Sequence, residues 1–374
     1  MAHFIKRKDG YAVRFYIEED NIKKQVYLYE KGWDKDACEA AMVEYKKKCK
    51  SGFIIDDKIT VSEFFVKWYE DYVADNLAYS TKRRYYELLK IHATPYLGEI
   101  KLSQIKPANI QSFYTDRLKI GLSPTTVLHM HRLLHLVFKS AVMWQYIQYN
   151  PVDSVKAPRQ KYHEIEILLD DELQTLLDAV KNEAAFIPIY IASTTGMRLG
   201  EVCGLQYTDV DFDNNIFYVR KSFKRAEEGK MKLKVTKTHR SKRPIPMLPG
   251  TDIVLKEYAQ YKESFKLINE EKSTHFCIWP DGSPILPDYV TKVFKRYIRK
   301  LEYSEGFTFH CLRHTHASWL LMQGVNPKVI AERLGHTSVN ILLNRYSHLI
   351  KDTQKDVIST LNTSLFLSKN NDDK

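Results

Sequence analysis

The sequence predicts a multidomain α+β protein. Its 374 residues suffice for two or three domains, and three kinds of pattern follow one another along the chain. Short runs separated by turn signals predict a small three-stranded β-sheet with a helix near the N-terminus. Apolar residues at helical spacing then predict an all-α region. After it, strands and helices mix, which predicts a mainly helical domain with a small antiparallel sheet.

The first 55 residues are expected to form a separate module. Strands are expected at 4–8, 12–18 and 23–29, with a tight turn at Asp9-Gly10 between the first two. Asp34 can cap a helix that runs to about Cys49. A ribbon of two or three strands fits the DNA major groove, so this sheet suits a reading surface. The alternative is a dimerisation or capping appendage.

Residues 59–155 are expected to be entirely helical. Ser123 followed by Pro124 marks one helix start, and Pro107 opens another. The apolar residues at helical spacing are interpreted as core and include Val61, Phe64, Phe65, Trp68, Leu133 and Val137. The basic helix start at 82–84 can touch phosphates or simply be solvated. The polar, proline-punctuated segment from 150 to 161 is interpreted as an interdomain linker.

Residues 165–374 are expected to form the third domain. Asp170 is interpreted as a helix cap, a further helix is expected at 187–194, and strands are expected at 215–219 and within 234–247. Helices return from Pro287 onward. Asn326 followed by Pro327 predicts another helix start, and Gly335 can end that helix.

The charge balance favours a polyanionic partner. The formal net charge is +11, so nucleic acid is the simplest partner, although solubility alone can explain a basic chain. The five cysteines include no Cys-x-x-Cys pair, which fits a reducing compartment and argues against a disulfide framework or a zinc knuckle. No apolar run suits a signal peptide or a membrane span. We therefore expect a soluble, cytoplasmic protein with no membrane partner.

Arg198 stands in Thr-Thr-Gly-Met-Arg-Leu-Gly-Glu, close to a predicted helix start. Its guanidinium is a planar fork of donors that matches two oxygens of a phosphate. Glu201 follows three residues later and can orient Arg198 by an i, i+3 pair. Taken alone, this pattern also fits an ordinary surface ion pair.

Two histidines and a second arginine follow towards the C-terminus. His310 and Arg313 are three residues apart and are expected on one helix face. His310 and His314 have an i, i+4 spacing that zinc sites use, but no glutamate follows His310 and Arg313 stands between them, which argues against a metal. His336 comes just after a predicted helix end, where it can bind a phosphate oxygen or cap the helix.

Tyr346 lies ten residues beyond that histidine, in Arg-Tyr-Ser-His. A tyrosine ionises near pH 10 in water, so forming the phenolate at pH 7 costs about 4 kcal/mol, and nearby cations lower that cost. Lys237, in a predicted hairpin with a polar tip, could protonate a leaving oxygen. Lys234, Lys242 and Arg243 compete with it for this role on chemistry alone.

The ordered set of motifs resembles the tyrosine recombinases of the phage integrase family. The motifs are Thr-Gly-Met-Arg-Leu-Gly-Glu, Lys-Thr before Ile-Pro, His-x-x-Arg, Leu-Gly-His and Tyr-Ser-His. The resemblance implies a SAM-like core-DNA-binding domain at 59–155 and a catalytic domain at 165–374. It also likens residues 1–55 to the arm-binding domain of integrases from phages and conjugative transposons of Gram-positive bacteria.

The resemblance also implies roles for single residues. Arg198 and Arg313 would clamp the scissile phosphate, Lys237 would act as general acid, and His310 would assist proton transfer. His336 would bind the phosphate, and Tyr346 would attack it to give a 3′-phosphotyrosyl link. No cofactor or metal is implied, because the link preserves the bond energy. The segment before the tyrosine, Val-Asn-Ile-Leu-Leu-Asn, is more apolar than is usual in the family.

The expected function is site-specific recombination that integrates and excises a mobile element or prophage. The implied partners are double-stranded DNA at attachment sites, three further copies in a homotetramer, an excisionase and a host DNA-bending protein. A short apolar patch at Leu365-Phe366-Leu367 is a hypothetical contact to a neighbouring protomer. One alternative is a Xer-type chromosome resolution recombinase, but the N-terminal module argues against it. The other is a catalytically silent DNA-binding protein, but the complete set of catalytic residues argues against it.

Overall fold

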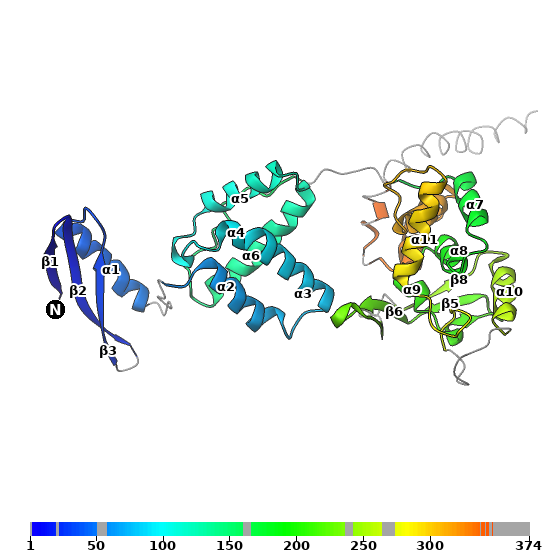
Figure 1. Cartoon of the computed structure of the whole chain (residues 1–374), viewed down its shortest axis with the longest axis horizontal. Helices are drawn as coiled ribbons and strands as arrows, with labels where there is room; N and C mark the ends of the chain where they lie inside the picture. The colour runs from blue at the N-terminus through cyan, green and yellow to red at the C-terminus, as the bar shows by residue number, and fades with distance from the viewer. Residues whose placement is uncertain are drawn as a thin grey trace, which may run out of the picture. The chain divides into compact units, whose positions relative to one another are not determined.

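The computed structural model describes residues 2–19, 22–50, 58–159, 166–235, 242–263, 274–336, 338–340, 342–343 and 346. It divides the chain into two compact units, Met1–Tyr162 and His163–Lys374. The expected fold class is confirmed: a small three-stranded sheet with a helix, an all-helical region, and a mainly helical second unit with small sheets (Figure 1). The boundaries of 1–55, 59–155 and 165–374 remain predictions.

The N-terminal sheet has three antiparallel strands in the order β1-β2-β3. They are β1 (His3–Arg7), β2 (Gly10–Glu19) and β3 (Ile22–Tyr29), and α1 (Lys35–Lys50) packs on one face of the sheet (Figure 1). Asp34 caps α1 as expected, because its Oδ1 accepts a hydrogen bond from the Ala37 amide at 2.8 Å. The core beneath the helix is thin and is built around Val13, Phe15, Cys38 and Met42.

The helical region follows the predicted periodicity. Its elements are α2 (Val61–Trp68), the π-helix η1 (Tyr69–Val73), α3 (Tyr79–Tyr86), the π-helix η2 (Glu87–Ala93), α4 (Thr94–Leu97), the 3-10 turn η3 (Leu102–Gln104), α5 (Pro107–Lys119) and α6 (Pro124–Met143). Ser123 caps α6, with its side chain accepting from the Thr126 amide. The buried Trp68 indole donates to Ser140 on α6 at 2.9 Å, which ties the first and last helices together.

The second unit places helices around two small antiparallel sheets. Its elements are α7 (Asp170–Ala179), α8 (Phe186–Thr195), α9 (Leu199–Cys203), η4 (Tyr207–Asp209), β4 (Val210–Asp211), β5 (Ile216–Val219), β6 (Lys221–Arg225), η5 (Glu227–Gly229), β7 (Met231–Val235), β8 (Arg243–Pro246), α10 (Thr251–Glu263), α11 (Pro287–Lys300), α12 (His310–Met322) and α13 (Pro327–Leu334). One sheet has the order β4-β5-β8, and β6 pairs with β7.

The start of α7 differs from the prediction by one residue. Asp170 was expected to cap the helix, whereas Leu169 occupies the N-cap position and Asp170 is the first helical residue. The reason is that the Glu172 carboxylate accepts the Leu169 amide at 2.8 Å, so the acidic first turn caps the helix from inside. The caps of α13 match the prediction: Asn326 accepts from the Lys328 amide and Gly335 is left-handed.

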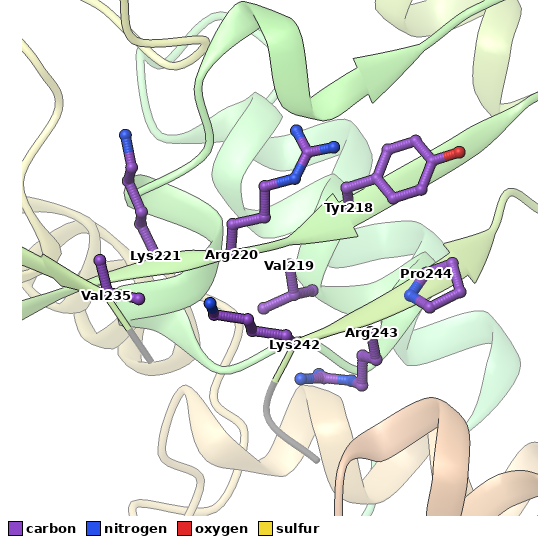
Figure 2. A pocket seen from close by; sticks show the side chains of 8 residues that line it. All are labelled: Tyr218, Val219, Arg220, Lys221, Val235, Lys242, Arg243 and Pro244. Carbon is purple, nitrogen blue, oxygen red and sulfur yellow. The ribbon is translucent and has the colours of Figure 1, made fainter. Parts of the chain in front are cut away.

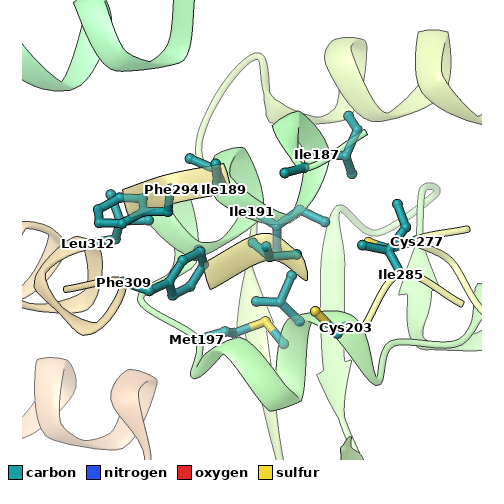
Figure 3. Close-up of a cluster of buried hydrophobic side chains, with 14 of the residues drawn as sticks. Ile187, Ile189, Ile191, Met197, Cys203, Cys277, Ile285, Phe294, Phe309 and Leu312 are labelled. Carbon is teal, nitrogen blue, oxygen red and sulfur yellow. The ribbon is translucent and has the colours of Figure 1, made fainter. Parts of the chain in front are cut away.

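The core of the second unit forms around α8, which is apolar on nearly all sides. Ile187, Ile189 and Ile191 are buried there, against Phe294 of α11 and Leu312 of α12 (Figure 3). Complete burial explains why α8 shows no amphipathic pattern. The helix therefore gives the unit a rigid centre, from which α9 and the adjoining loop project towards the predicted site residues.

Candidate active site

Arg198 emerges at a sharp turn between α8 and α9. Gly196 makes this turn possible, because its φ is 67° and a Cβ there would lie 2.5 Å from Leu334 and 2.9 Å from the His316 ring. Arg198 is the N-cap of α9, and its Nη1 donates to Glu201 Oε1 at 2.9 Å. The pair is not an ordinary surface ion pair, since the Arg198 side chain is 42% exposed but that of Glu201 only 4%.

Arg313, by contrast, is buried in α12. Its Nη1 donates to the Gly196 carbonyl at 2.8 Å and its Nη2 to the Leu334 carbonyl at 2.7 Å. Burial, followed by the charges of Arg198 and Arg243, lowers the pKa of Arg313 to about 9. The charge of Arg198 therefore acts on Arg313. These are the two residues whose guanidinium groups are predicted to clamp a phosphate.

Three arginines donate hydrogen bonds to carbonyls at the C-terminus of α13. Three consecutive carbonyls accept from them: Arg333 O from Arg243 Nε at 2.7 Å, Leu334 O from Arg313 Nη2 at 2.7 Å, and Gly335 O from Arg198 Nη2 at 3.5 Å. The last carbonyls of a helix lack partners within it and carry the negative end of its dipole. They therefore offset part of the repulsion between the guanidinium groups and fix their directions.

Glu201 is the one carboxylate that the described contacts place among these arginines. Its Oε2 lies 3.0 Å from Arg243 Nη2, and its Oε2 also accepts the Arg198 amide at 3.0 Å. Burial would raise the pKa of Glu201, but Arg243 and Arg198 outweigh it and hold the pKa below its usual value. Arg243, considered in the sequence as a possible general acid, is instead a buried partner of this carboxylate.

A further arginine, the half-buried Arg333, links α13 to its neighbours. It donates from Nε to His316 Nε2 at 3.0 Å, from Nη1 to the Pro246 carbonyl at 2.9 Å, and from Nη2 to the Thr194 carbonyl at 3.2 Å. Burial foremost, then the Arg333 charge, lowers the pKa of His316 to about 3. His316 is therefore a neutral acceptor that joins α12 to α13. Within the described residues, no group of three or more possible metal ligands occurs.

Tyr346 lies in an apolar cluster, with its hydroxyl group on a histidine. The residue is 2% exposed, and its ring packs with Leu320, Leu321 and Leu334, among others. Its Oη lies 2.5 Å from His314 Nδ1. The charge of Tyr346 also acts on Arg313, whose pKa it raises against the larger lowering effects. The phenol is thus held next to the arginine cluster, and its oxygen has a polar partner.

At the start of α12, His310 is exposed to solvent whereas Arg313 is buried. The His310 ring meets that of His314 edge-on, with the centroids 4.9 Å apart and an interplanar angle of 88°. His336 follows the left-handed Gly335, and its amide donates to the Ala331 carbonyl at 2.9 Å. His336 is half-buried, and it directly follows the three residues whose carbonyls bind the arginines.

Lys237 lies outside the described residues, as does Leu365-Phe366-Leu367. The two chain segments that flank residues 236–241 border a basic hollow of about 440 Å³ (Figure 2). Arg220 and Lys221 line it where β5 leads into β6, and Lys242 and Arg243 line it at the start of β8. Arg220 pairs with Asp209 at 2.8 Å. The hollow provides positive charge beside the arginine cluster.

Sequence reasoning did not predict the contacts of three residues of this arrangement: Arg243, His314 and Arg333. The contacts of Arg243 and Arg333 join elements far apart in the chain, so no local pattern predicts them. His314 did carry a signal, since it stands one helical turn after His310, but that spacing drew attention to zinc.

The chain is similar in sequence to known proteins. A family model described as "Phage integrase family" matches residues 166–352, and one described as "Phage integrase, N-terminal SAM-like domain" matches residues 60–118. The chain is 27% identical to a "Tyrosine recombinase XerC-like" of Caldanaerobacter subterraneus, covering 96% of this chain and 98% of the relative. It is 26% identical to the ICEBs1 integrase of Bacillus subtilis, covering 76% and 79%.

The fold also occurs in solved structures. A further relative in sequence, the transposase from Tn916 of Enterococcus faecalis, is 23% identical over 96% of this chain and 93% of its own. Among structures, the Tn1549 transposon integrase in complex with a circular intermediate DNA is similar with a TM-score of 0.71 at 22% identity, covering 81% of this chain and 99% of that one. A lambda integrase tetramer bound to a Holliday junction has a TM-score of 0.58 at 17% identity, covering 90% and 95%.

Proposed function

The chain belongs to the phage integrase family, and we propose that it integrates and excises a mobile element by breaking and rejoining DNA through Tyr346. The observation that carries the proposal is the convergence of three arginines on the last carbonyls of α13, with the phenol of Tyr346 beside them. Such fixed cations stabilise the charge that develops on a transferring phosphoryl group.

The proposed roles are those that the resemblance implies. Arg198, half-exposed, and Arg313 hold the scissile phosphate from two sides, and His336 adds a third contact. The Tyr346 oxygen attacks phosphorus, the bond from phosphorus to the 5′ oxygen breaks, and Lys237 donates a proton to that oxygen. His310 assists the proton transfers. The products are a 3′-phosphotyrosyl link and a free 5′ hydroxyl, and the reverse step rejoins the strand without ATP or another cofactor.

We propose that the free face of the N-terminal sheet reads arm-type DNA sites. The face opposite α1 carries exposed polar and aromatic side chains in register, with Arg14 opposite Tyr27 and Tyr16 opposite Gln25. Arg7 Nη2 donates to the Tyr27 hydroxyl at 2.7 Å, which fixes two such groups on β1 and β3, the strands that flank β2. Arginine, glutamine and tyrosine suit the donor and acceptor patterns of base edges in the major groove.

A basic stripe on α11 is proposed as a further contact to the duplex. Val290, Phe294 and Ile298 bury one side of the helix. The exposed side lines a hollow of about 570 Å³ with lysines and arginines only: Lys292, Lys295, Arg296, Arg299 and Lys300. These charges suit phosphates, which fix register and orientation rather than sequence.

The assembly is proposed to be a tetramer on two synapsed sites, acting in the cytoplasm with an excisionase and a host bending protein. Recombination needs four strand cuts, and the lambda integrase relative is a tetramer on its junction. Deleting residues 362–374 should impair synapsis if the apolar tail patch contacts a neighbour. Among the helices of the described chain, none is both long and apolar enough to cross a membrane.

One observation favours a second candidate, chromosome resolution. The relative named XerC-like covers nearly the whole chain, including the N-terminal module. An integrase should recombine the circular junction of its element with a host site, whereas a resolution enzyme should recombine two copies of one chromosomal site. Sequencing the DNA that flanks the coding sequence identifies the sites from which both pairs of substrates are made. The pair that the enzyme recombines preferentially decides between the two functions.

The enzymatic proposal is tested with a nicked attachment-site duplex. The intact protein should form a covalent adduct on a denaturing gel, and Tyr346→Phe should form none while still shifting the duplex in a native gel. Because the phenylalanine keeps the apolar packing of the ring, the comparison isolates the hydroxyl. An intact protein that binds the duplex and never forms the adduct would be a catalytically silent DNA-binding protein.

A further inference from the structure

His314 makes the hydrogen bond to the proposed nucleophile. The distance from its Nδ1 to the Tyr346 Oη is 2.5 Å, and the ring centroids are 6.0 Å apart. This distance is slightly shorter than the roughly 2.6–3.2 Å that a proton-transferring pair shows. His310, to which the proton-transfer role was assigned from sequence, meets the His314 ring and lies on its exposed side.

The surroundings orient this hydrogen bond. The Tyr346 ring is packed against Ala317, Leu320 and Leu321 of α12, and His314 projects from the same helix one turn earlier. A ring held on apolar neighbours has few orientations, so its oxygen is directed to one place. His314 is half-buried and His310 exposed, so the three rings form a short polar path from the phenol towards solvent.

We propose that His314 is a catalytic residue that accepts the phenolic proton of Tyr346 during strand cleavage and returns it during rejoining. This inference rests on the proposed function. In cleavage the Oη–H bond breaks, the proton moves to His314 Nδ1, the Oη–phosphorus bond forms and the phosphorus–O5′ bond breaks. O5′ receives its proton from the general acid on the other side of the phosphate, and the two proton transfers reverse on rejoining.

The other groups near the phenol suit different tasks. Arg313 is a cation and stabilises the phenolate but cannot take up its proton. His310 lies behind His314 and is placed to pass the proton on to solvent. An imidazole titrates near pH 6.5 in water and a phenol near 10, so a neutral imidazole is a proton acceptor of suitable strength at pH 7.

The test measures single-turnover adduct formation on the nicked duplex with His314→Leu and His314→Asn, and with His310→Asn as the matched control one turn away. His314→Leu should reduce the rate about 10²-fold or more. His314→Asn keeps a hydrogen-bond acceptor but no base, so it should orient the phenol without restoring the rate. His310→Asn should have a smaller effect. Native gels and melting temperatures verify that the variants bind DNA and fold.

A modified substrate separates base from acid. A 5′-bridging phosphorothiolate has a thiolate leaving group that needs no general acid, so it should restore cleavage by Lys237→Ala but not by His314→Leu. The pH dependence gives a second readout, with His310, Tyr346 and Arg313 as the titratable and charged groups around His314. Between pH 7 and 8, below the pKa of Arg313, the rate of His314→Leu should rise about 10-fold with the phenolate fraction, and that of the wild type should barely change.

Several results would overturn the inference. His314→Leu could cleave at the wild-type rate, or faster, which would make His314 a latch that restrains Tyr346. Rescue of His314→Leu by the phosphorothiolate would make it an acid, and an unchanged pH profile would make its role structural. If His314→Leu does not fold, His314→Asn carries the same comparisons. Failure of the wild type to form the adduct would contradict the proposed function instead.

Discussion

Two ion pairs in different regions of the molecule have nearly the same length and opposite surroundings. In the helical region, Arg83 Nε lies 2.8 Å from Glu87 Oε1, with side chains 55% and 45% exposed. In the second unit, Arg243 Nη2 lies 3.0 Å from Glu201 Oε2, with side chains 6% and 4% exposed. Water can replace either partner of the first pair. It cannot do so for the second, so the buried pair fixes positions and the exposed pair does not.

The difference explains how an enzyme can keep several arginines close together. Glu201 and the carbonyls at the end of α13 provide the negative charge that water provides elsewhere, and they do so in fixed directions. Burying a charge is costly unless it is paired and hydrogen-bonded. Arg198 occupies an intermediate place, since it shares Glu201 but remains open to solvent, where a phosphate can reach it.

The largest effect on stability is expected for Arg243→Leu. The variant leaves the Glu201 carboxylate buried without its main partner and the Arg333 carbonyl without its donor. Removing one partner of a buried pair costs about 3–5 kcal/mol. Urea unfolding should show this loss, and hydrogen exchange should place it in α9 and α13.

The matched control is the double variant Arg243→Leu with Glu201→Leu, which removes both charges. It should recover part of the lost stability, because an apolar pair replaces an unpaired buried charge. A double variant less stable than Arg243→Leu alone would show that the Glu201 contacts to Arg198 matter more than its pair with Arg243.

Arg198→Ala should separate catalysis from stability. The half-exposed guanidinium contributes little to folding, but it is proposed to face the phosphate. We expect adduct formation on the nicked duplex to fall about 10²–10³-fold, as for loss of one oxyanion donor. Duplex affinity and the urea midpoint should change little. A variant that loses DNA binding altogether would make Arg198 a structural residue.

Acid should weaken the buried pair. The pKa of Glu201 is held below its usual value by Arg243 and Arg198. Its contribution to stability is therefore complete above the pKa of the unfolded chain, near 4.5, and is lost as the pH falls through the lower folded value. The difference in unfolding free energy between the wild type and Glu201→Gln should shrink as the pH falls from 5 to 3. A constant difference would contradict this.

Local signals predicted most of the fold, and tertiary contacts account for what was missed. Helix caps such as Ser123 and Asn326 act within three residues, so the sequence shows them directly. Arg198 was also recognisable from its motif. The partners of Arg243 lie 42 and 90 residues away, and the contact between His314 and Tyr346 spans 32. No periodicity encodes such distances, so these roles appear only once the helices are packed.

The smallest effect is expected for Arg83→Leu, the exposed counterpart of Arg243→Leu. The pair with Glu87 joins successive turns where α3 meets η2, and both side chains stay accessible to water. Exposed i, i+4 pairs contribute at most about 0.5 kcal/mol, because water and salt screen the attraction and ordering two long side chains costs entropy. The urea midpoint should therefore be unchanged within error, at low and at high salt. Arg83 also belongs to the basic segment 82–84, which the structure places towards the end of α3 and not at a helix start, so native gels at low salt would reveal a phosphate contact as weaker duplex binding. A change in stability as large as that of Arg243→Leu would mean that burial does not distinguish the two pairs.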